Sequence, residues 1–296
     1  MSATTILDRS SGPGATDAML ADAPHRIASI ALIVHDLDKV VDFYVSVIGL
    51  TVLDRSVGDA WLGAGDITLV ALRHDPRARR STPREAGLFH TAFLLPERAD
   101  LSAWLRHVAS LRVPLQGAAD HMVSEALYLA DPEGNGIEIY VDRPASTWPR
   151  DANGITMTTA PLDLPALAAD TDRPWLGFPA GGQVGHVHVQ VGELSEAGAF
   201  YGGVLGFDVT CRYPGAAFYG SGGYHHQLAA NVWNSRGADL RSGSMTGLAE
   251  VEIFTAPARI EAARERAAPG TIRADLPGRL ALVDPWGTPI MLVANS

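Results

Sequence analysis

The sequence predicts an α+β protein built from four repeated strand–helix–strands modules in two domains. Two observations support this prediction. The segments 30–53 and 187–210, IALIVHDLDKVVDFYVSVIGLTVL and VHVQVGELSEAGAFYGGVLGFDVT, align without a gap. The segments that end each half, DPEGNGIEIYV from Asp131 and DPWGTPIMLVA from Asp284, also match in order. An internal repeat determines the whole architecture, so equivalent segments of the two halves are expected to form equivalent elements.

The first repeated segment combines strand spacing with helix spacing. In both copies, alternating apolar residues give way to a helical pattern that stops at a glycine. The shared positions include Phe43–Tyr44, matched by Phe200–Tyr201, and Gly49, matched by Gly206. We therefore expect each copy to form a strand, a helix that carries the Phe-Tyr pair, and a further strand.

A second pair of segments follows the same order more weakly. GLFHTAFLLPERADLSAWLRHV begins at Gly87 and GLAEVEIFTAPARIEAARERA begins at Gly247, and each reads as a strand followed by a helix. The chain therefore divides into four modules, numbered 1 to 4 in chain order. Their predicted ranges are 27–74, 86–144, 183–235 and 245–295.

Two modules in each half predict two domains, over residues 26–145 and 181–296. Residues 1–25 are expected to form a flexible tail. The connection 146–180 is rich in Pro, Asp and Thr, which favours a linker, and LDLPALAAD within it predicts one short helix.

Composition narrows the class of protein. The 296 residues are 47% hydrophobic and 19% charged, as in an ordinary globular protein, and the formal net charge of −10 argues against a general nucleic-acid binder. The one cysteine, Cys211, excludes a disulfide framework or a cysteine-rich zinc site and is expected to be a small buried residue. Neither a signal peptide nor a membrane span is evident, so a cytoplasmic location is expected.

A lone glutamate interrupts an apolar strand near the end of the first half. Ile137 to Val141 alternates like a strand and follows a turn-rich segment, 131–136. Glu138 lies within this strand among isoleucines. Its side chain either points to solvent, as charged strand residues usually do, or has a specific partner.

Histidines supply further metal-binding chemistry. Packing or solvent roles are expected for four of the ten, namely His25, His35, His74 and His107. His90 and His186 open strands at matching places in modules 2 and 3, and His188, two residues on, is the competing choice. Two imidazoles and one carboxylate suit non-heme Fe(II) when they converge, and His90, His186 and Glu138 form such a set. Sequence spacing alone does not establish that they converge.

These residues resemble a known family. The strand–helix module with its Phe-Tyr pair and glycine, the strand-opening histidine and the closing DPEGNGIE strand are similar to the vicinal oxygen chelate superfamily. That superfamily includes glyoxalase I, fosfomycin-resistance proteins and extradiol ring-cleaving dioxygenases. The resemblance covers nearly all of residues 26–295. It implies βαβββ modules that pair into cupped mixed β-sheets with helices outside, and metal ligands on the first and last strands.

A closer similarity is to the two-domain bacterial catechol 2,3-dioxygenases. HMVSEALYLADPEGNGIEIY looks like that family's closing segment, which implies that His121 and Tyr128 lie beside the ligand Glu138. The resemblance assigns the other two ligands to His90 and His186, with Fe(II) as the metal and Mn(II) suited to the same set. In GGYHHQLAANVW it implies an acid–base histidine, for which His226 is preferred and His225 is the alternative. If this segment is a strand, the two histidines face opposite ways.

The chain departs from the family in where its ligands lie. The better known extradiol enzymes carry all ligands in the C-terminal domain. Here module 4 has Glu250 where a histidine is expected and Met291 where the glutamate is expected, and module 1 has Ser29. We therefore predict that modules 2 and 3 pair across the two halves and hold the complete set. Modules 1 and 4 would then form a pair without ligands.

The resemblance implies an extradiol dioxygenase that acts on a small aromatic diol and O2 and yields a hydroxymuconic semialdehyde-type product. One alternative is a glyoxalase-type isomerase using Ni(II) or Zn(II), which usually adds a second carboxylate ligand. Another is a non-catalytic binding or resistance protein. No nucleic-acid or membrane partner is expected. The ring substituents and the oligomeric state, a homo-oligomer included, stay open, and Asn231 and Trp233 receive no role.

Overall fold

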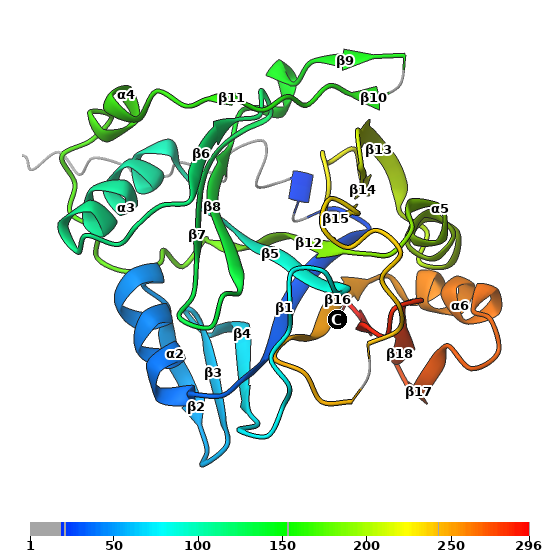
Figure 1. Cartoon of the computed structure of the whole chain (residues 1–296). Coiled ribbons are helices and arrows are strands. Elements are labelled where there is room, and N and C mark those ends of the chain that lie inside the picture. The colour runs from blue at the N-terminus through cyan, green and yellow to red at the C-terminus, as the bar shows by residue number, and fades with distance from the viewer. Residues whose placement is uncertain (1–18, 21, 153, 242, 296) are drawn as a thin grey trace, which may run out of the picture.

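A computed structural model describes residues 19–295 apart from residues 21, 153 and 242, and it contains two large mixed β-sheets flanked by helices (Figure 1). Residues 1–18, most of the predicted tail, lie outside the described residues. Within the described ranges, no helix has the length and apolar character needed to cross a bilayer.

The first sheet has eight strands, in the order β17-β18-β19-β16-β1-β4-β3-β2. It combines module 1 with module 4 through the antiparallel pair β1/β16. Its strands are β1 (His25–Val34), β2 (Thr51–Arg55), β3 (Asp59–Ala64), β4 (Ile67–His74), β16 (Gly247–Thr255), β17 (Ile272–Leu276), β18 (Arg279–Val283) and β19 (Pro289–Ala294).

The second sheet has nine strands, in the order β11-β6-β7-β8-β5-β12-β15-β14-β13. It combines module 2 with module 3 through the antiparallel pair β5/β12. Its strands are β5 (Gly87–Leu94), β6 (Gly117–Asp120), β7 (Ser124–Ala130), β8 (Gly136–Asp142), β11 (Ala160–Pro161), β12 (Gln183–Gln190), β13 (Asp208–Tyr213), β14 (Ala216–Gly220) and β15 (Leu228–Asn231).

Each sheet therefore takes one module from each half of the sequence. This confirms the predicted pairing of modules 2 and 3, and the α+β class with cupped mixed sheets is also confirmed. The helical elements are α2 (Leu37–Phe43), η1 (Tyr44–Ile48), α3 (Arg98–Ser110), η2 (Ala145–Thr147), α4 (Leu164–Ala168), α5 (Leu194–Ala197), η3 (Gly198–Val204) and α6 (Pro257–Arg266). A separate two-stranded ribbon joins β9 (Arg150–Asp151) and β10 (Gly154–Ile155).

The repeated Phe-Tyr segment forms the same unusual element in both halves. The α-helical turns of α2 and α5 pass into the π-helical turns η1 and η3, which contain the repeated tyrosines Tyr44 and Tyr201. Gly49 and Gly206 follow with φ of 88° and 84°, a left-handed conformation in which a side chain would be strained. The repeated glycine is therefore required by the backbone at each helix end.

Side-chain contacts also tie the two modules within each half. Tyr201 donates a hydrogen bond of 2.8 Å to Asp284, which joins module 3 to module 4. In the first half, the Trp104 indole of α3 donates to the carbonyl of Val47, at 2.9 Å. Sheet pairing across the halves and helix contacts within them thus hold the four modules together.

The repeated Asp-Pro motif organises the turn before each closing strand. One Asp131 oxygen accepts the backbone N–H groups of Glu133 and Asn135, at 2.8 and 2.9 Å. Asp284 repeats this pattern in the second half with Trp286 and Thr288. These aspartates satisfy backbone donors that would otherwise be buried without partners, so their repetition has a structural cause.

The helices begin where their capping residues predict. Glu97 and Asp100 form a reciprocal capping box at the start of α3, and Asp36 accepts the Lys39 N–H at the start of α2. The short helix predicted in the connection is α4, where Asp163 accepts the N–H of Ala166. The predicted linker therefore contains its expected helix.

Cys211 and three of the four histidines predicted to have packing or solvent roles are placed as follows. Cys211 is buried, as expected. The ring nitrogens of His35 and His107 lie 2.7 and 2.8 Å from backbone carbonyls, so both rings donate hydrogen bonds, and His74 is exposed at the end of β4. None of these three lines the cavity described below.

His25, which begins β1, is fully buried beside the other sheet. Its ring packs on Phe207 at a centroid distance of 4.4 Å, and Arg259 lies 3.4 Å from its Nε2. Burial, together with the positive charge of Arg259, lowers the pKa of His25 to about 4. The folded protein therefore holds this histidine neutral at pH values at which the unfolded chain would protonate it.

This burial predicts a loss of stability in acid. The contribution of neutral His25 is complete above pH 6.5 and declines as the pH falls toward 4. Between pH 8 and pH 5, the free energy of unfolding of the wild type should fall by about 2 kcal/mol more than that of a His25→Phe variant. Denaturant titrations at both pH values measure the free energy of unfolding of each protein. An equal fall in that free energy for the wild type and the His25→Phe variant would contradict the prediction.

Candidate metal centre and catalytic cavity

Strand register places three candidate ligands on one face of the second sheet. Ala92 of β5 pairs with Glu138 of β8 on one side and with His186 of β12 on the other. His90 lies two residues before Ala92, and alternate residues of a strand face the same way. The small Ala92 side chain, fully buried, leaves space between the three longer side chains.

A close backbone approach at the start of β12 accompanies this arrangement. The pairing of β12 with β5 shifts register between Val184 and His186, so the chain bulges at Gly185. A Cβ on Gly185 would lie 1.8 Å from the Tyr140 hydroxyl oxygen, so a side chain there would clash. Bulges commonly re-aim side chains beside functional sites, and His186 is the next residue.

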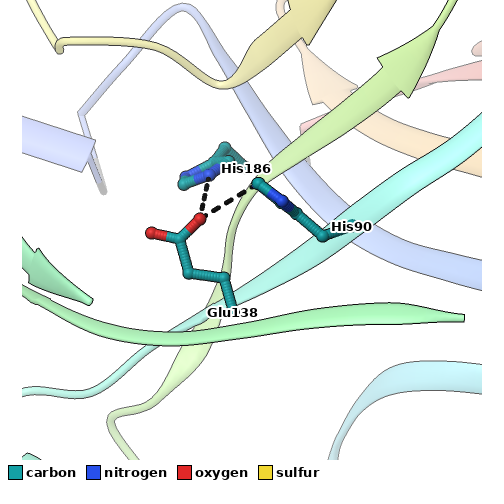
Figure 2. Close-up of side chains that lie close together, drawn as sticks. All are labelled: His90, Glu138 and His186. Atoms are coloured by element: carbon teal, nitrogen blue, oxygen red, sulfur yellow. Dashed lines mark hydrogen bonds and ion pairs between the residues drawn. The ribbon is translucent and has the colours of Figure 1, made fainter. Parts of the chain in front are cut away.

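The three side chains converge on one carboxylate oxygen (Figure 2). Glu138 Oε2 lies 3.0 Å from His90 Nε2 and 3.3 Å from His186 Nε2. Their exposed fractions are 7% for His90, 3% for Glu138 and 2% for His186. Within the described part of the chain, this is the cluster of histidine and acidic side chains whose spacing could hold a metal ion.

Electrostatics favour an anionic Glu138 carboxylate beside a neutral His186 imidazole. Burial acts to raise the pKa of Glu138, but the neighbouring His186 and His90 outweigh it and hold that pKa well below its usual range. Burial lowers the pKa of His186 to about 4, against the opposing effect of Glu138. An ionised carboxylate and a neutral imidazole are the forms in which these groups bind a metal ion.

The donor set fits a divalent metal ion. His90 Nε2 is buried without a hydrogen-bond partner, although it lies against the carboxylate. A buried polar atom without a partner is costly, and a metal ion would satisfy it. The 3.0 and 3.3 Å separations are compatible with ligands that each lie about 2.1 Å from one ion. The residues therefore suit a two-histidine, one-carboxylate site, a set typical of non-heme Fe(II).

His188 has a different partner from that of His186. The backbone N–H of Trp233 donates to Asn231 Oδ1 at 3.2 Å, so the Asn231 amide nitrogen must face His188, whose Nε2 lies 3.0 Å away. His188 Nε2 therefore accepts a hydrogen bond and carries no proton. With this nitrogen engaged, we propose His186, rather than His188, as the ligand from β12.

His121 and Tyr128 form a hydrogen-bonded pair at the edge of the cluster. His121 Nδ1 donates to the carbonyl of Thr158 at 2.7 Å, so its Nε2 is left as an acceptor for the Tyr128 hydroxyl, 2.6 Å away. Tyr128 pairs with Glu138 across β7 and β8, which places both side chains on one face. Burial, with the nearby Glu138 charge, raises the pKa of Tyr128 well above 10, so its hydroxyl keeps its proton.

His226 and His225 occupy different layers. The expectation that they sit on an alternating strand is wrong, because they lie in the loop before β15, after Gly222 and Gly223 turn the chain with positive φ. His226 lines the cavity, and its ring centroid is 4.1 Å from that of His186. His225 lies behind it, where it contacts His226 and Asp142.

The cluster lies at the wall of a cavity of about 290 Å³. Aromatic side chains form much of the remaining wall, and neither lysine nor arginine is among its described lining residues. The aromatic members are Phe89, Tyr213, Phe218 and Trp233. A second cavity, of about 310 Å³, shares Phe89 but has no histidine among its described lining residues.

The first sheet carries ordinary polar contacts at the corresponding positions. Ser29 donates to Glu252 at 3.1 Å, and Glu252 pairs with Arg279 at 2.9 Å. Glu250 lies 3.5 Å from Arg73. No histidine–carboxylate cluster with metal-ligand spacing occurs among the described residues of this sheet.

Several residues of the site were not recognised in the sequence. Asn231 and Trp233 received no role, although Asn231 bonds to His188 and Trp233 lines the cavity. Asp142 contacts His225. Its signal was present, because Asp142 lies four residues after Glu138 and a two-residue alternation places both on one strand face.

The cupped sheets and the buried histidine–carboxylate cluster define a protein of the vicinal oxygen chelate class. The family model described as the Glyoxalase/Bleomycin resistance protein/Dioxygenase superfamily matches residues 26–139 and 183–270, and the chain belongs to that superfamily.

Individual relatives refine this assignment. The chain is 41% identical over 223 residues to catechol-2,3-dioxygenase of Bacillus subtilis (strain 168), across 73% of this chain and 78% of the relative. It is 28% identical over 124 residues to biphenyl-2,3-diol 1,2-dioxygenase 3 of Rhodococcus globerulus, across 41% of this chain and 65% of that protein. By these similarities it is an extradiol dioxygenase-like enzyme.

The solved structures agree on the fold. Glyoxalase I from Zea mays superposes with a TM-score of 0.57 at 20% identity and covers 94% of this chain and 95% of its own. At this identity, the similarity concerns the fold and not the activity.

The ligand assignment predicts which substitutions abolish metal binding. Glu138→Gln, His90→Asn and His186→Asn should each weaken the affinity of the metal-free protein for Mn(II) by more than about 100-fold, because each removes one of three protein ligands. Calorimetric titration measures these affinities.

His188→Asn is the matched control, since it removes a neighbouring buried histidine that already has a partner. Its Mn(II) affinity should stay within about fivefold of wild type. Loss of binding in His188→Asn, with normal binding in His186→Asn, would reverse the assignment.

Proposed function

We propose that this chain is an extradiol ring-cleaving dioxygenase. It inserts both atoms of O2 into a catechol-type diol and yields a hydroxymuconic semialdehyde-type product. Fe(II) held by His90, His186 and Glu138 is the proposed cofactor, and Mn(II) suits the same ligands.

The observation that carries this proposal is the buried two-histidine, one-glutamate cluster in an aromatic-walled cavity that also contains His226 and Tyr128. The 41% identity to a catechol-2,3-dioxygenase supports the same chemistry. When bound, the metal ion supplies a Lewis acid that lowers the pKa of a diol hydroxyl and a site for O2. The other steps fall to the protein's own side chains.

His226 is the proposed general base. Burial and the neighbouring histidines hold its pKa well below the usual value, so the ring is neutral before reaction and can accept a proton. Its contact with His186 places it beside the proposed metal ligands. A neutral histidine at this position takes the diol proton and later returns it to a developing oxygen anion.

Tyr128 is proposed to bind a substrate hydroxyl as a hydrogen-bond acceptor. Its hydroxyl keeps its proton and lines the cavity beside Glu138. His121, held by its bond to the Thr158 carbonyl, accepts that proton in a hydrogen bond, so the Tyr128 oxygen has its lone pairs left for a substrate O–H group. A prepositioned acceptor orients the diol before the reaction.

A glyoxalase-type isomerase fits the site less well. Such an enzyme usually adds a second carboxylate from the last strand of the partner module, here β15. The described residues of β15 are Leu228, Ala229, Ala230 and Asn231, which include no acid, and the cluster holds one carboxylate. Ring cleavage is therefore the preferred reaction.

The proposed activity predicts a coloured product. Anaerobic loading with Fe(II), followed by catechol in air, should give rapid absorbance in the yellow semialdehyde band. Glu138→Ala should lower the rate by more than about 1,000-fold, because the substitution removes the carboxylate that is both the proposed anionic ligand and the partner of the two histidines.

A Glu250→Ala variant serves as the control, since Glu250 is a strand glutamate of the other sheet and lies outside the cavity. It should cleave catechol at the wild-type rate. An iron-loaded wild type that leaves catechol and alkylcatechols unchanged in air would refute the proposed reaction.

The cavity also predicts a preference for uncharged ring substituents. No cationic side chain lines it among the described residues, and Glu138 already contributes a negative charge. A carboxylate on the ring would be desolvated without a partner. We expect kcat/KM for 2,3-dihydroxybenzoate to be at least about 100-fold below that for 3-methylcatechol, since the loss of solvation exceeds about 2.7 kcal/mol. Equal values would show that an unidentified cation reaches the site.

A further inference from the structure

Behind His226, a chain of hydrogen bonds leads away from the cavity to a buried carboxylate. His226 Nδ1 lies 2.8 Å from His225 Nδ1, and His225 Nε2 lies 2.8 Å from Asp142 Oδ1. The side chains of His225 and Asp142 are 1% and 4% exposed. Neither residue lines the cavity. The contacts therefore run from the proposed general base to a carboxylate that has no access to substrate.

The carboxylate end determines where each proton lies. An Asp142 carboxylate can only accept, so His225 Nε2 must carry a proton and donate it. A neutral imidazole has one N–H, so His225 Nδ1 is an acceptor. The 2.8 Å contact between the two Nδ1 atoms then requires His226 Nδ1 to be the donor. His226 consequently has an unprotonated Nε2.

The other carboxylate oxygen is held as firmly. Tyr224 donates to Asp142 Oδ2 at 2.8 Å, and the Tyr140 hydroxyl lies 2.9 Å from that of Tyr224. With both oxygens engaged, Asp142 keeps its position relative to His225. Tyr140 and Asp142 belong to β8, which also carries Glu138, so one strand supplies both the proposed metal ligand and this carboxylate.

We propose that Asp142 and His225 are positioning residues that hold His226 as its Nδ1–H tautomer, with the Nε2 lone pair free to take a diol proton; this inference rests on the proposed function. No described residue hydrogen-bonds to His226 Nε2, and His226 lines the cavity. In the transfer, the substrate O–H bond breaks and an Nε2–H bond forms. The resulting His226 imidazolium still donates to His225, and His225 still donates to Asp142. One imidazole ring therefore separates the new positive charge from the Asp142 carboxylate.

Substitution of Asp142 tests this assignment. An asparagine can turn its amide N–H toward His225, which makes His225 Nε2 an acceptor and reverses both tautomers. In a serine protease whose catalytic histidine is oriented by a buried aspartate, the change of that aspartate to asparagine lowers kcat by about 10⁴-fold. We expect Asp142→Asn to lower kcat for catechol by about 100-fold to 10,000-fold, with Mn(II) affinity within about fivefold of wild type.

Tyr224→Phe is the matched control, because it removes a bond to the same carboxylate and leaves the His225 contact in place. We expect it to lower kcat by less than about tenfold, in keeping with the loss of one ordinary hydrogen bond. A general weakening of this buried cluster would instead reduce activity equally in the two variants, and that result would overturn the assignment.

The tautomer itself gives a readout independent of activity. Nitrogen-15 NMR of the histidine-labelled, Zn(II)-loaded full chain, assigned with a His226→Gln variant, should show His226 protonated at Nδ1. In Asp142→Asn it should be protonated at Nε2. An Nε2–H tautomer in the wild type, or no change in Asp142→Asn, would overturn the proposal even if that variant lost activity through misfolding.

The two proposals can fail separately. A wild type that shows the Nδ1–H tautomer but leaves all diols intact would refute the ring-cleaving function and support the positioning of His226 by His225 and Asp142. A wild type that cleaves catechol while Asp142→Asn keeps its kcat would refute that positioning role and leave the function standing.

Discussion

The antiparallel pairing of β5 with β12 is the constraint on which the site depends. It joins two strands from opposite halves of the chain and sets Ala92 opposite His186, while β8 sets Glu138 against the same alanine from the other side. A slip of one residue would turn one histidine to the opposite face of the sheet. The geometry of the candidate metal site is therefore set by strand register between modules 2 and 3.

Burial of a carboxylate between two imidazoles is unfavourable unless something compensates it. Glu138 loses its hydration on burial. Two buried histidines, each with a ring nitrogen that lacks a hydrogen-bond partner, compensate for that loss only in part. Such a cluster contributes little to stability but is well suited to a divalent ion. The equivalent region of the other sheet shows the contrast, since Ser29, Glu252 and Arg279 satisfy one another through partly exposed contacts. One sheet thus contains the buried cluster, whereas the other has partly exposed polar contacts at the equivalent positions.

The modules could be predicted because the same residues recur at equivalent positions in the two halves of the sequence. Gly49 and Gly206 end equivalent helices, and Asp131 and Asp284 organise equivalent turns. The candidate ligand set followed from the matching positions of His90 and His186 together with the resemblance, and the crossed pairing followed from where ligands were missing. The surroundings of the site could not be predicted in this way. Asn231 meets His188 only through β12/β15 pairing, and the turn at Gly222 and Gly223 removed His225 and His226 from the expected strand alternation.

We propose that one metal ion binds where the two halves of the chain meet. Crystals of the iron-loaded protein, measured on both sides of the iron absorption edge, would locate that ion. We expect an anomalous peak within about 2.3 Å of His90 Nε2, His186 Nε2 and a Glu138 oxygen. A peak in the sheet of modules 1 and 4, or one bound by His188 without His186, would contradict it.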